Sequence, residues 1–259
     1  MTVNMRKKFD QNGYVSLRNV LTINEKKMIK NIIFDNFKEH IKLPKIKKFD
    51  LENINFHKEL INFRKSKPKK FGEIYDKINL NSKFRSLFYS KKFMNYFAKC
   101  LNIKNNNIYI NGFMMRFDVP RDRRNKLNWH QDSPYYMMSY PKYNAGVCWC
   151  AITNNNRDNG TLKFIPKSHS RFIKTIGHKK GKYISEQYTL SILRNEITKL
   201  KDLNQKFGDM SLLHMNLKHR SGDNNSDRVR ITIGCRFIDM TSSFNVGKEI
   251  YKFNDEKYN

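Results

Sequence analysis

The 259-residue sequence has few cysteines, few acidic residues and no long apolar run. Its four cysteines show neither zinc-site spacing nor a disulfide framework, so we expect them to be reduced and buried. No apolar stretch reaches the roughly 20 residues that a membrane-spanning helix needs. Residues 1–10 are charged and contain no signal-peptide core. These absences favour a cytoplasmic protein without structural zinc or disulfides. The cysteines are Cys100, Cys148, Cys150 and Cys235.

Acidic residues number 23 against 51 lysines and arginines, which gives a formal net charge of +28. A chain this basic can bind nucleic acid, anionic membranes or anionic small molecules. The excess is mostly lysine, it is spread along the chain, and it accompanies many Asn, Ile, Phe and Tyr residues with AT-rich codons. Genome composition is therefore one explanation of the charge. Because no basic segment is interleaved with aromatic residues, nucleic-acid binding is not favoured, and an anionic small substrate is the more plausible interpretation.

Apolar periodicity predicts helices in the first hundred residues. Thr22 and Glu25 form a capping-box pattern, and an apolar stripe at helical spacing follows through residues 28–37. A second stripe covers residues 93–101, with Ser90 as a plausible N-cap. Residues 41–80 are rich in lysine and interrupted by proline. They are either a loop with short helices at the mouth of the active site or a solvated excursion.

Alternating or buried strand patterns predict a β-rich second half. They occur at residues 108–117, 146–153, 161–165 and 229–237. The fold expected is mainly β with flanking helices, a double-stranded β-helix (jelly-roll, cupin-like) barrel in a single domain, residues 1–259. Residues 1–106 would be its mostly helical N-terminal part, residues 107–240 the jelly-roll core and residues 241–259 a tail. Residues 170–204 resemble an insertion over the barrel mouth, where substrate specificity would lie.

His130 and Asp132 form the first half of a candidate metal site. Two residues apart on an extended strand, their side chains point to the same face. One imidazole and one carboxylate can hold a single divalent metal. A second histidine would complete the two-histidine, one-carboxylate triad of non-haem iron(II) oxygenases, which leaves positions open for oxygen and substrate.

His219 is the candidate for the second histidine. Arg230 follows eleven residues later on a strand-like run, and its guanidinium could hold a carboxylate through two hydrogen bonds, as lysine could not. Two histidines, one aspartate and a buried arginine are the parts needed to bind iron and use 2-oxoglutarate. His214 competes with His219, but the pattern of Ser221, Asn224 and Arg230 fits His219.

These residues and the segments given below resemble the phytanoyl-CoA dioxygenase family of Fe(II)/2-oxoglutarate oxygenases over nearly the whole chain. Lys167 departs from the family pattern, which usually has glycine in that turn. The segments are the opening Phe9 with Gly13-Tyr14-Val15, the central His130-Gln131-Asp132, Asn159-Gly160-Thr161-Leu162, Pro166-Lys167-Ser168-His169, and Gly208-Asp209 before the distal histidine.

The resemblance implies a function and a set of roles. His130, Asp132 and His219 would bind Fe(II), and Arg230 and Ser221 would hold the far carboxylate of 2-oxoglutarate. The implied reaction hydroxylates an unactivated C–H bond of a small molecule with O2, releases succinate and CO2, and uses ascorbate as a possible reductant. Asp132 implies hydroxylation, because related halogenases carry a small residue at that position.

Two further residues are candidates for the co-substrate pocket. Trp149 matches a family position beside 2-oxoglutarate, a role compatible with core packing. Arg116 faces either 2-oxoglutarate or the surface. Among the other polar residues, Gln131 should face away from the metal, His169 should be structural, and Arg228 is out of register with the co-substrate arginine. Tyr135, Tyr136 and Tyr140 would line the substrate entrance or cover the barrel rim.

Alternatives to hydroxylation remain at this stage. The same oxidant can desaturate, cyclise or epimerise a substrate. A protein of another class, a non-catalytic metal-binding or regulatory one, could keep the fold, but the complete triad and the arginine argue against it. A basic polyanion-binding protein would show salt-sensitive binding. Neither the substrate nor the oligomeric state can be predicted.

Overall fold

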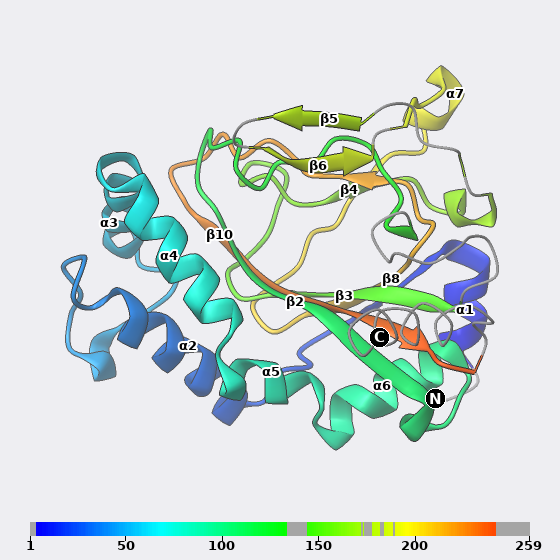
Figure 1. Ribbon diagram of the computed structural model, residues 1–259, viewed down its shortest axis with the longest axis horizontal. Helices are drawn as coiled ribbons and strands as arrows, with labels where there is room; N and C mark the ends of the chain where they lie inside the picture. The colour runs from blue at the N-terminus through cyan, green and yellow to red at the C-terminus, as the bar shows by residue number, and fades with distance from the viewer. Residues whose placement is uncertain are drawn as a thin grey trace, which may run out of the picture.

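The computed structural model describes residues 4–133, 144–171, 173, 178–181, 184–188 and 190–241 (Figure 1). Within these ranges every helix is too short or too polar to cross a membrane. The helices are α1 Asn4–Asn12, α2 Ile23–Phe37, η1 Ile46–Lys48, α3 Ile54–Ser66, α4 Pro68–Asn79, α5 Ser82–Phe88, α6 Lys91–Leu101, η2 Asn105–Asn107, η4 Ser168–Ser170 and α7 Arg194–Ile197. The strands are β1 Tyr14–Leu17, β2 Ile108–Asp118, β3 Ala145–Ala151, β4 Lys163–Phe164, β5 His178–Gly181, β6 Ile184–Tyr188, β7 Lys201–Asp202, β8 Met210–His214, β9 His219–Arg220 and β10 Arg230–Asp239.

The predicted start of α2 is confirmed. The Glu25 N–H donates to the Thr22 hydroxyl at 3.2 Å, and the Thr22 N–H donates to the Glu25 carboxylate at 2.7 Å. This capping box satisfies two backbone donors that the first helical turn leaves open. Ser90 is the N-cap residue of α6, as predicted, although its side chain makes no capping hydrogen bond.

The described strands form open antiparallel sheets. The largest has the order β1-β8-β3-β10-β2, a second has the order β7-β4-β9, and β5 pairs with β6. Antiparallel sheets with flanking helices match the expected class. The expected closed jelly-roll barrel is not confirmed, because the strand pairs found among the described residues do not close one.

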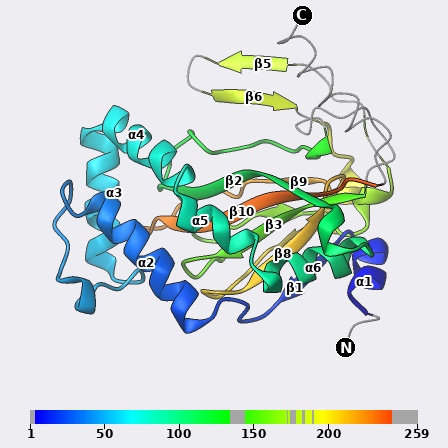
Figure 2. The same ribbon diagram turned by 60° about the horizontal axis from the view of Figure 1, so that its bottom comes forward.

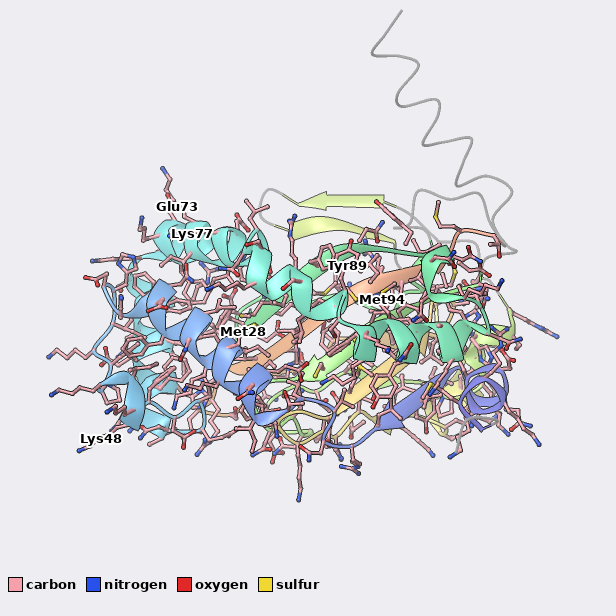
Figure 3. All side chains as sticks on the ribbon, turned by 90° about the horizontal axis from the view of Figure 1, so that it is seen from below. Met28, Lys48, Glu73, Lys77, Tyr89 and Met94 are labelled. Atoms are coloured by element: carbon pink, nitrogen blue, oxygen red, sulfur yellow. The ribbon has the colours of Figure 1, made fainter. Side chains whose placement is uncertain are left out.

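Helices cover one face of the five-stranded sheet, and the short strands β4, β5, β6 and β9 lie toward its other face (Figures 1 and 2). Figure 3 views the helical layer from below, with Met28 of α2 and Met94 of α6 on it. Aromatic pairs join the two layers: the Phe37 and Phe117 rings lie 5.3 Å apart, and Phe97 stacks on Phe237 at 4.6 Å. Such contacts fix the sheet on a rigid support.

Strand alternation then decides which side chains enter the site. On β10, Ile231, Ile233 and Phe237 are buried in the core beneath the helices. Arg230 and Arg236 point to the opposite face, where a cavity lies. Because neighbouring side chains of a strand point to opposite faces, one strand serves both the core and the site.

Residues 41–80 fold onto the sheet through α3 and α4. Their buried side chains include Phe63 and Phe71, which pack against the core around Phe37. Tyr75 of α4 lines the cavity. Figure 3 shows Glu73 and Lys77 of the same helix pointing away from the body of the protein. This segment is therefore an amphipathic helical wall of the site, and the solvated-excursion alternative was wrong.

Buried His57 makes stability sensitive to acid. Its Nδ1 accepts a hydrogen bond from the Val229 N–H at 3.2 Å, and burial together with the Arg228 charge lowers its pKa from 6.5 to about 4. Between these values the unfolded chain binds a proton that the folded chain does not, so the free energy of unfolding falls as pH drops. We expect His57→Asn, which keeps an acceptor for Val229, to remove up to about 3 kcal/mol of this pH dependence. Urea denaturation at pH 7.5 and pH 4.5 measures it.

The matched control for this variant is the exposed His40. We expect His40→Asn to leave the pH dependence of the wild type unchanged. An unchanged dependence in His57→Asn would show that the buried imidazole titrates normally in the folded chain.

Candidate functional site

His130, Asp132 and His219 come together as predicted. One ligand atom from each residue lies within 4.8 Å of the others, and all three side chains are buried. The two histidines face each other across a backbone bridge in which each N–H donates to the other's carbonyl at 3.0 Å. The Asp132 N–H donates to Met215 O at 2.7 Å, which fixes the loop that carries the carboxylate. Backbone pairing therefore holds all three ligands in place.

Both imidazoles are oriented by a backbone carbonyl two residues earlier. Nδ1 of His130 lies 2.6 Å from Asn128 O, and Nδ1 of His219 lies 2.8 Å from Leu217 O. Because a carbonyl only accepts, each Nδ1 carries a proton, which leaves Nε2 as the nitrogen that can bind a metal. Nε2 of His219 lies 3.4 Å from Asp132 Oδ2. This is the arrangement that orients metal-binding histidines through their second nitrogen.

Burial keeps the first histidine neutral. Burial and the nearby His219 lower the pKa of His130 from 6.5 to about 3. Metal ligands must be deprotonated, so a histidine that is already neutral near pH 7 binds a cation without releasing a proton. A donor set of one carboxylate and two imidazoles fits a divalent iron.

Arg230 is buried and held from two sides. Only 2% of it is exposed, and its guanidinium donates to Gly160 O and, at 2.5 Å, to the Asp118 carboxylate. Arg116 also pairs with Asp118, at 3.3 Å. Burial raises the pKa of Asp118, but the two arginine charges outweigh it and lower the pKa below its ordinary value. Asp118 is therefore an anion that fixes both arginines.

Donors without a hydrogen bond line the cavity beside this ion pair. Within the described part of the chain, Arg116 Nε, Trp149 Nε1 and Arg230 Nε are buried and make no hydrogen bond. The guanidinium carbons of Arg116 and Arg230 lie 5.1 and 6.0 Å from the Trp149 ring centre. Buried donors normally have partners, so three of them at one cavity indicate a site for an anion. Arg116 thus faces the cavity.

The cavity connects these donors to the triad. It has a volume of about 190 Å³ and is lined by the three candidate ligands together with both arginines. A cavity of about 150 Å³ accommodates a benzene-sized molecule, so a five-carbon dicarboxylate fits. Ser221 lines the same cavity, and its hydroxyl accepts from the Leu127 N–H at 3.1 Å. These residues can hold 2-oxoglutarate.

The backbone conformation and the close packing of the Asn159-Gly160-Thr161 segment explain why glycine occupies position 160. Gly160 has φ +79°, and a Cβ there would lie 2.7 Å from Asn224 N. A Cβ on Gly222 would lie 2.3 Å from Thr161 O. Two glycines therefore allow close approach of the two chain segments, which places the Gly160 carbonyl against Arg230.

Other polar residues singled out in the sequence lie away from the cavity. Gln131 donates to Arg171 O and Asn216 O at 2.7 and 2.6 Å. His169 packs on His214, with ring centres 4.9 Å apart, and its Nε2 faces Asp10 O at 2.8 Å. Arg228, which the sequence analysis set aside as out of register with Arg230, donates to Glu52 O at 2.8 Å. Tyr135, Tyr136 and Tyr140 lie outside the described residues.

Sequence reasoning missed Asp118, Tyr75 and Arg236, all of which contribute to the site. Asp118 could have been found, because it lies two residues after Arg116 on one predicted strand and so shares its face. Arg236 shares the cavity-facing side of β10 with Arg230 for the same reason. The sequence did not point to Tyr75, because no specific helix was predicted in the lysine-rich segment of residues 41–80.

Comparisons with known proteins agree with this geometry. The family model for phytanoyl-CoA dioxygenase (PhyH) matches residues 9–232. A comparison with curated protein sequences gave no match. EvdO2 from Micromonospora carbonacea var. aurantiaca, complexed with 2-oxoglutarate, is a similar structure: it is 15% identical, with a TM-score of 0.62 over 91% of this chain and 90% of that chain.

Two further structures share the fold. EctD from S. alaskensis, with 2-oxoglutarate and 5-hydroxyectoine, is 15% identical, with a TM-score of 0.62 over 93% of this chain and 77% of that chain. The epimerase SnoN, in complex with Fe3+, alpha ketoglutarate and nogalamycin RO, is 13% identical, with a TM-score of 0.59 over 92% and 83% of the two chains. At these identities the similarity shows a shared fold.

Proposed function

The chain belongs to the phytanoyl-CoA dioxygenase family, and from this membership we propose that it is an Fe(II)- and 2-oxoglutarate-dependent dioxygenase that hydroxylates a small molecule. The observation that carries the proposal is the buried group of His130, Asp132 and His219 in one cavity with Arg230. The triad alone would suit several divalent metals. Arg230 is a buried arginine whose Nε makes no hydrogen bond in the described structure, so it can bind the carboxylate of 2-oxoglutarate.

Each residue has a task in this proposal. His130, Asp132 and His219 would hold the metal, with their lone pairs oriented by backbone hydrogen bonds. Arg230 and Ser221 would bind the far carboxylate of 2-oxoglutarate, and Asp118 would keep the arginine in place. When bound, iron with 2-oxoglutarate and O2 supplies an oxidant that takes hydrogen from an unactivated carbon. Burial of the triad would exclude water from that oxidant.

Hydroxylation is the finer part of the proposal. The carboxylate at position 132 supports it, because a side chain that occupies a metal position prevents a halide from taking that position. Similar folds serve other outcomes: SnoN is described as an epimerase and SnoK as a carbocyclase. Product analysis by mass spectrometry identifies hydroxylation, which adds one oxygen atom, whereas cyclisation or desaturation removes two hydrogens and epimerisation leaves the mass unchanged.

The test of the proposed activity is succinate production. We expect purified protein supplied with Fe(II), 2-oxoglutarate, O2 and ascorbate to release succinate. The rate of release should rise when a compound from a library of candidate substrates is accepted by the enzyme. Omitting any one of iron, 2-oxoglutarate or O2 should stop the release. Succinate that forms equally well without iron would contradict the proposal.

A further inference from the structure

Gln131 separates the first two candidate metal ligands in the sequence, and its side chain is completely buried. Its amide makes hydrogen bonds to three backbone groups. Nε2 donates to Asn216 O at 2.6 Å and to Arg171 O at 2.7 Å, and Oε1 accepts from the Ile173 N–H at 2.9 Å. One buried side chain therefore links the ligand loop, residues 130–132, to two other segments of the chain.

The first linked segment is the turn that precedes His219. Backbone N–H groups that follow Gln131 donate to Met215 O at 2.7 and 3.2 Å, so the turn already lies against the ligand loop. The Gln131 amide adds a bond to the next carbonyl, Asn216 O. The carbonyl after that, Leu217 O, lies 2.8 Å from Nδ1 of His219 and orients its imidazole. Gln131 thus fixes the turn one residue before the group that orients the third ligand.

The second linked segment is the backbone at Arg171 and Ile173, which follows η4 and precedes β5. Gln131 donates to this segment and also accepts from it. Only one orientation of the amide satisfies all three partners, because the reverse would set NH2 against an N–H and oxygen against two carbonyls. A buried amide that loses its partners costs free energy. The positions of the segment and of the ligand loop are therefore energetically linked.

Metal binding would restrain the ligand loop on both sides of Gln131. His130 and Asp132 flank it, and both would be bound to one ion. The short backbone between them would then lose freedom, which holds the amide toward its three partners. A restraint that favours these hydrogen bonds must in turn favour metal binding, because a coupling free energy between two sites is reciprocal.

We propose that Gln131 is a positioning residue that couples metal binding at the triad to the position of the backbone at Arg171 and Ile173. This inference rests on the metal site of the proposed function and gives a role to the residue between two of its ligands. Residues 171 and 173 begin the segment predicted to determine substrate specificity. Gln131 thereby gives a filled metal site an effect on the substrate side of the protein.

The test measures amide hydrogen exchange at Ile173 in the wild type, with and without saturating Fe(II) under anaerobic conditions. Mass spectrometry with fragmentation that resolves single amides reports this one N–H. It exchanges when its bond to Gln131 opens. We expect Fe(II) to slow the exchange about 10-fold, the lower end of the effect that groups orienting metal ligands have on metal affinity.

Gln131→Met keeps much of the side-chain volume and removes all three hydrogen bonds. By reciprocity, it should weaken Fe(II) binding by the same factor by which Fe(II) slows exchange at Ile173 in the wild type. Exchange at Ile173 should be fast in this variant and should no longer respond to Fe(II). Equilibrium dialysis measures the affinity. A role in packing alone predicts a lower thermal midpoint and no response of Ile173 to Fe(II) in the wild type.

Gln205 is the matched control for this variant. It is also buried, 5% exposed, and its Nε2 donates to Trp149 O and Ser211 Oγ at 3.4 and 3.2 Å. Gln205→Met removes a buried amide of the same kind outside the ligand loop. It should lower the thermal midpoint as Gln131→Met does, but leave the Fe(II) affinity and the response of Ile173 at wild-type values.

Two results would overturn the inference. One is wild-type exchange at Ile173 that Fe(II) leaves unchanged although dialysis shows that Fe(II) binds, and this result needs no variant to fold. The other is wild-type Fe(II) affinity in a folded Gln131→Met protein. Absence of Fe(II) binding by the wild type would instead contradict the proposed function itself, and the inference would fall with it.

Discussion

Asp132→Ala is expected to reduce Fe(II) affinity by more than about 100-fold and to abolish succinate production. Removing a group that only orients a ligand already costs 10- to 100-fold in metal affinity, so loss of a ligand costs more. Asp132 supplies the only carboxylate of the triad and lies 3.4 Å from His219 Nε2. Without it, two imidazoles would have to hold the cation. Anaerobic equilibrium dialysis with Fe(II) measures the change.

The exposed Asp158 provides the matched control. Asp158→Ala removes the same charge from the chain and should bind iron as the wild type does. Circular dichroism and thermal melting establish that both variants fold. Iron binding by Asp132→Ala that equals that of the control would exclude this carboxylate as a ligand.

Arg230→Met is expected to raise the dissociation constant for 2-oxoglutarate by at least about 100-fold while leaving Fe(II) affinity near that of the wild type. A two-pronged pair with a carboxylate includes two charge-assisted hydrogen bonds, each contributing about 1.5–3 kcal/mol. Methionine fills much of the space but donates no hydrogen bond. Isothermal titration with 2-oxoglutarate under anaerobic conditions measures the affinity.

Arg228→Met is the control for this effect. Arg228 precedes Arg230 by two residues but bonds to Glu52 O outside the cavity. The control should bind 2-oxoglutarate normally. Equal losses in both variants would mean that net positive charge, rather than a specific carboxylate pair, attracts the co-substrate. Normal binding in Arg230→Met would remove Arg230 from the co-substrate site.

The sequence was most informative where a short spacing implies a shared direction. The short spacing correctly paired His130 with Asp132, although the predicted strand was wrong, because these residues lie in a loop with a single bridge at His130. The long return to His219 could be recognised from the residues that follow it. The capping box at Thr22 and Glu25 was equally readable, because both of its hydrogen bonds are local in sequence. Contacts between residues two or three positions apart can therefore be predicted from the sequence.

Features that depend on pairing between distant segments were less accessible. Asp118 and Gly160 hold Arg230 from β2 and from the loop before β4, and only the folded sheet brings them together. A β-bulge at Gly112 of β2 exists only relative to the register of β10. A single alternating segment does not reveal which strand will lie beside it, nor whether the sheets close into a barrel.

The helical wall shows another limit. Lysines obscured the apolar stripe of α4, although Phe71, Ile74 and Ile78 are buried at helical spacing. Long lysine side chains on the solvent face make a segment look uniformly polar, even when one face packs tightly. The sequence therefore did not predict that Tyr75, within residues 41–80, lines the cavity.

The most direct test of the central claim is an anaerobic titration of the metal-free protein with Fe(II) and 2-oxoglutarate, followed by visible spectroscopy. Chelation of iron by the keto acid produces a metal-to-ligand charge-transfer band. The account predicts this band in the wild type, and its weakening in both Asp132→Ala and Arg230→Met. A folded wild-type protein that shows no band with both components in excess would contradict the oxygenase assignment and favour a binding role.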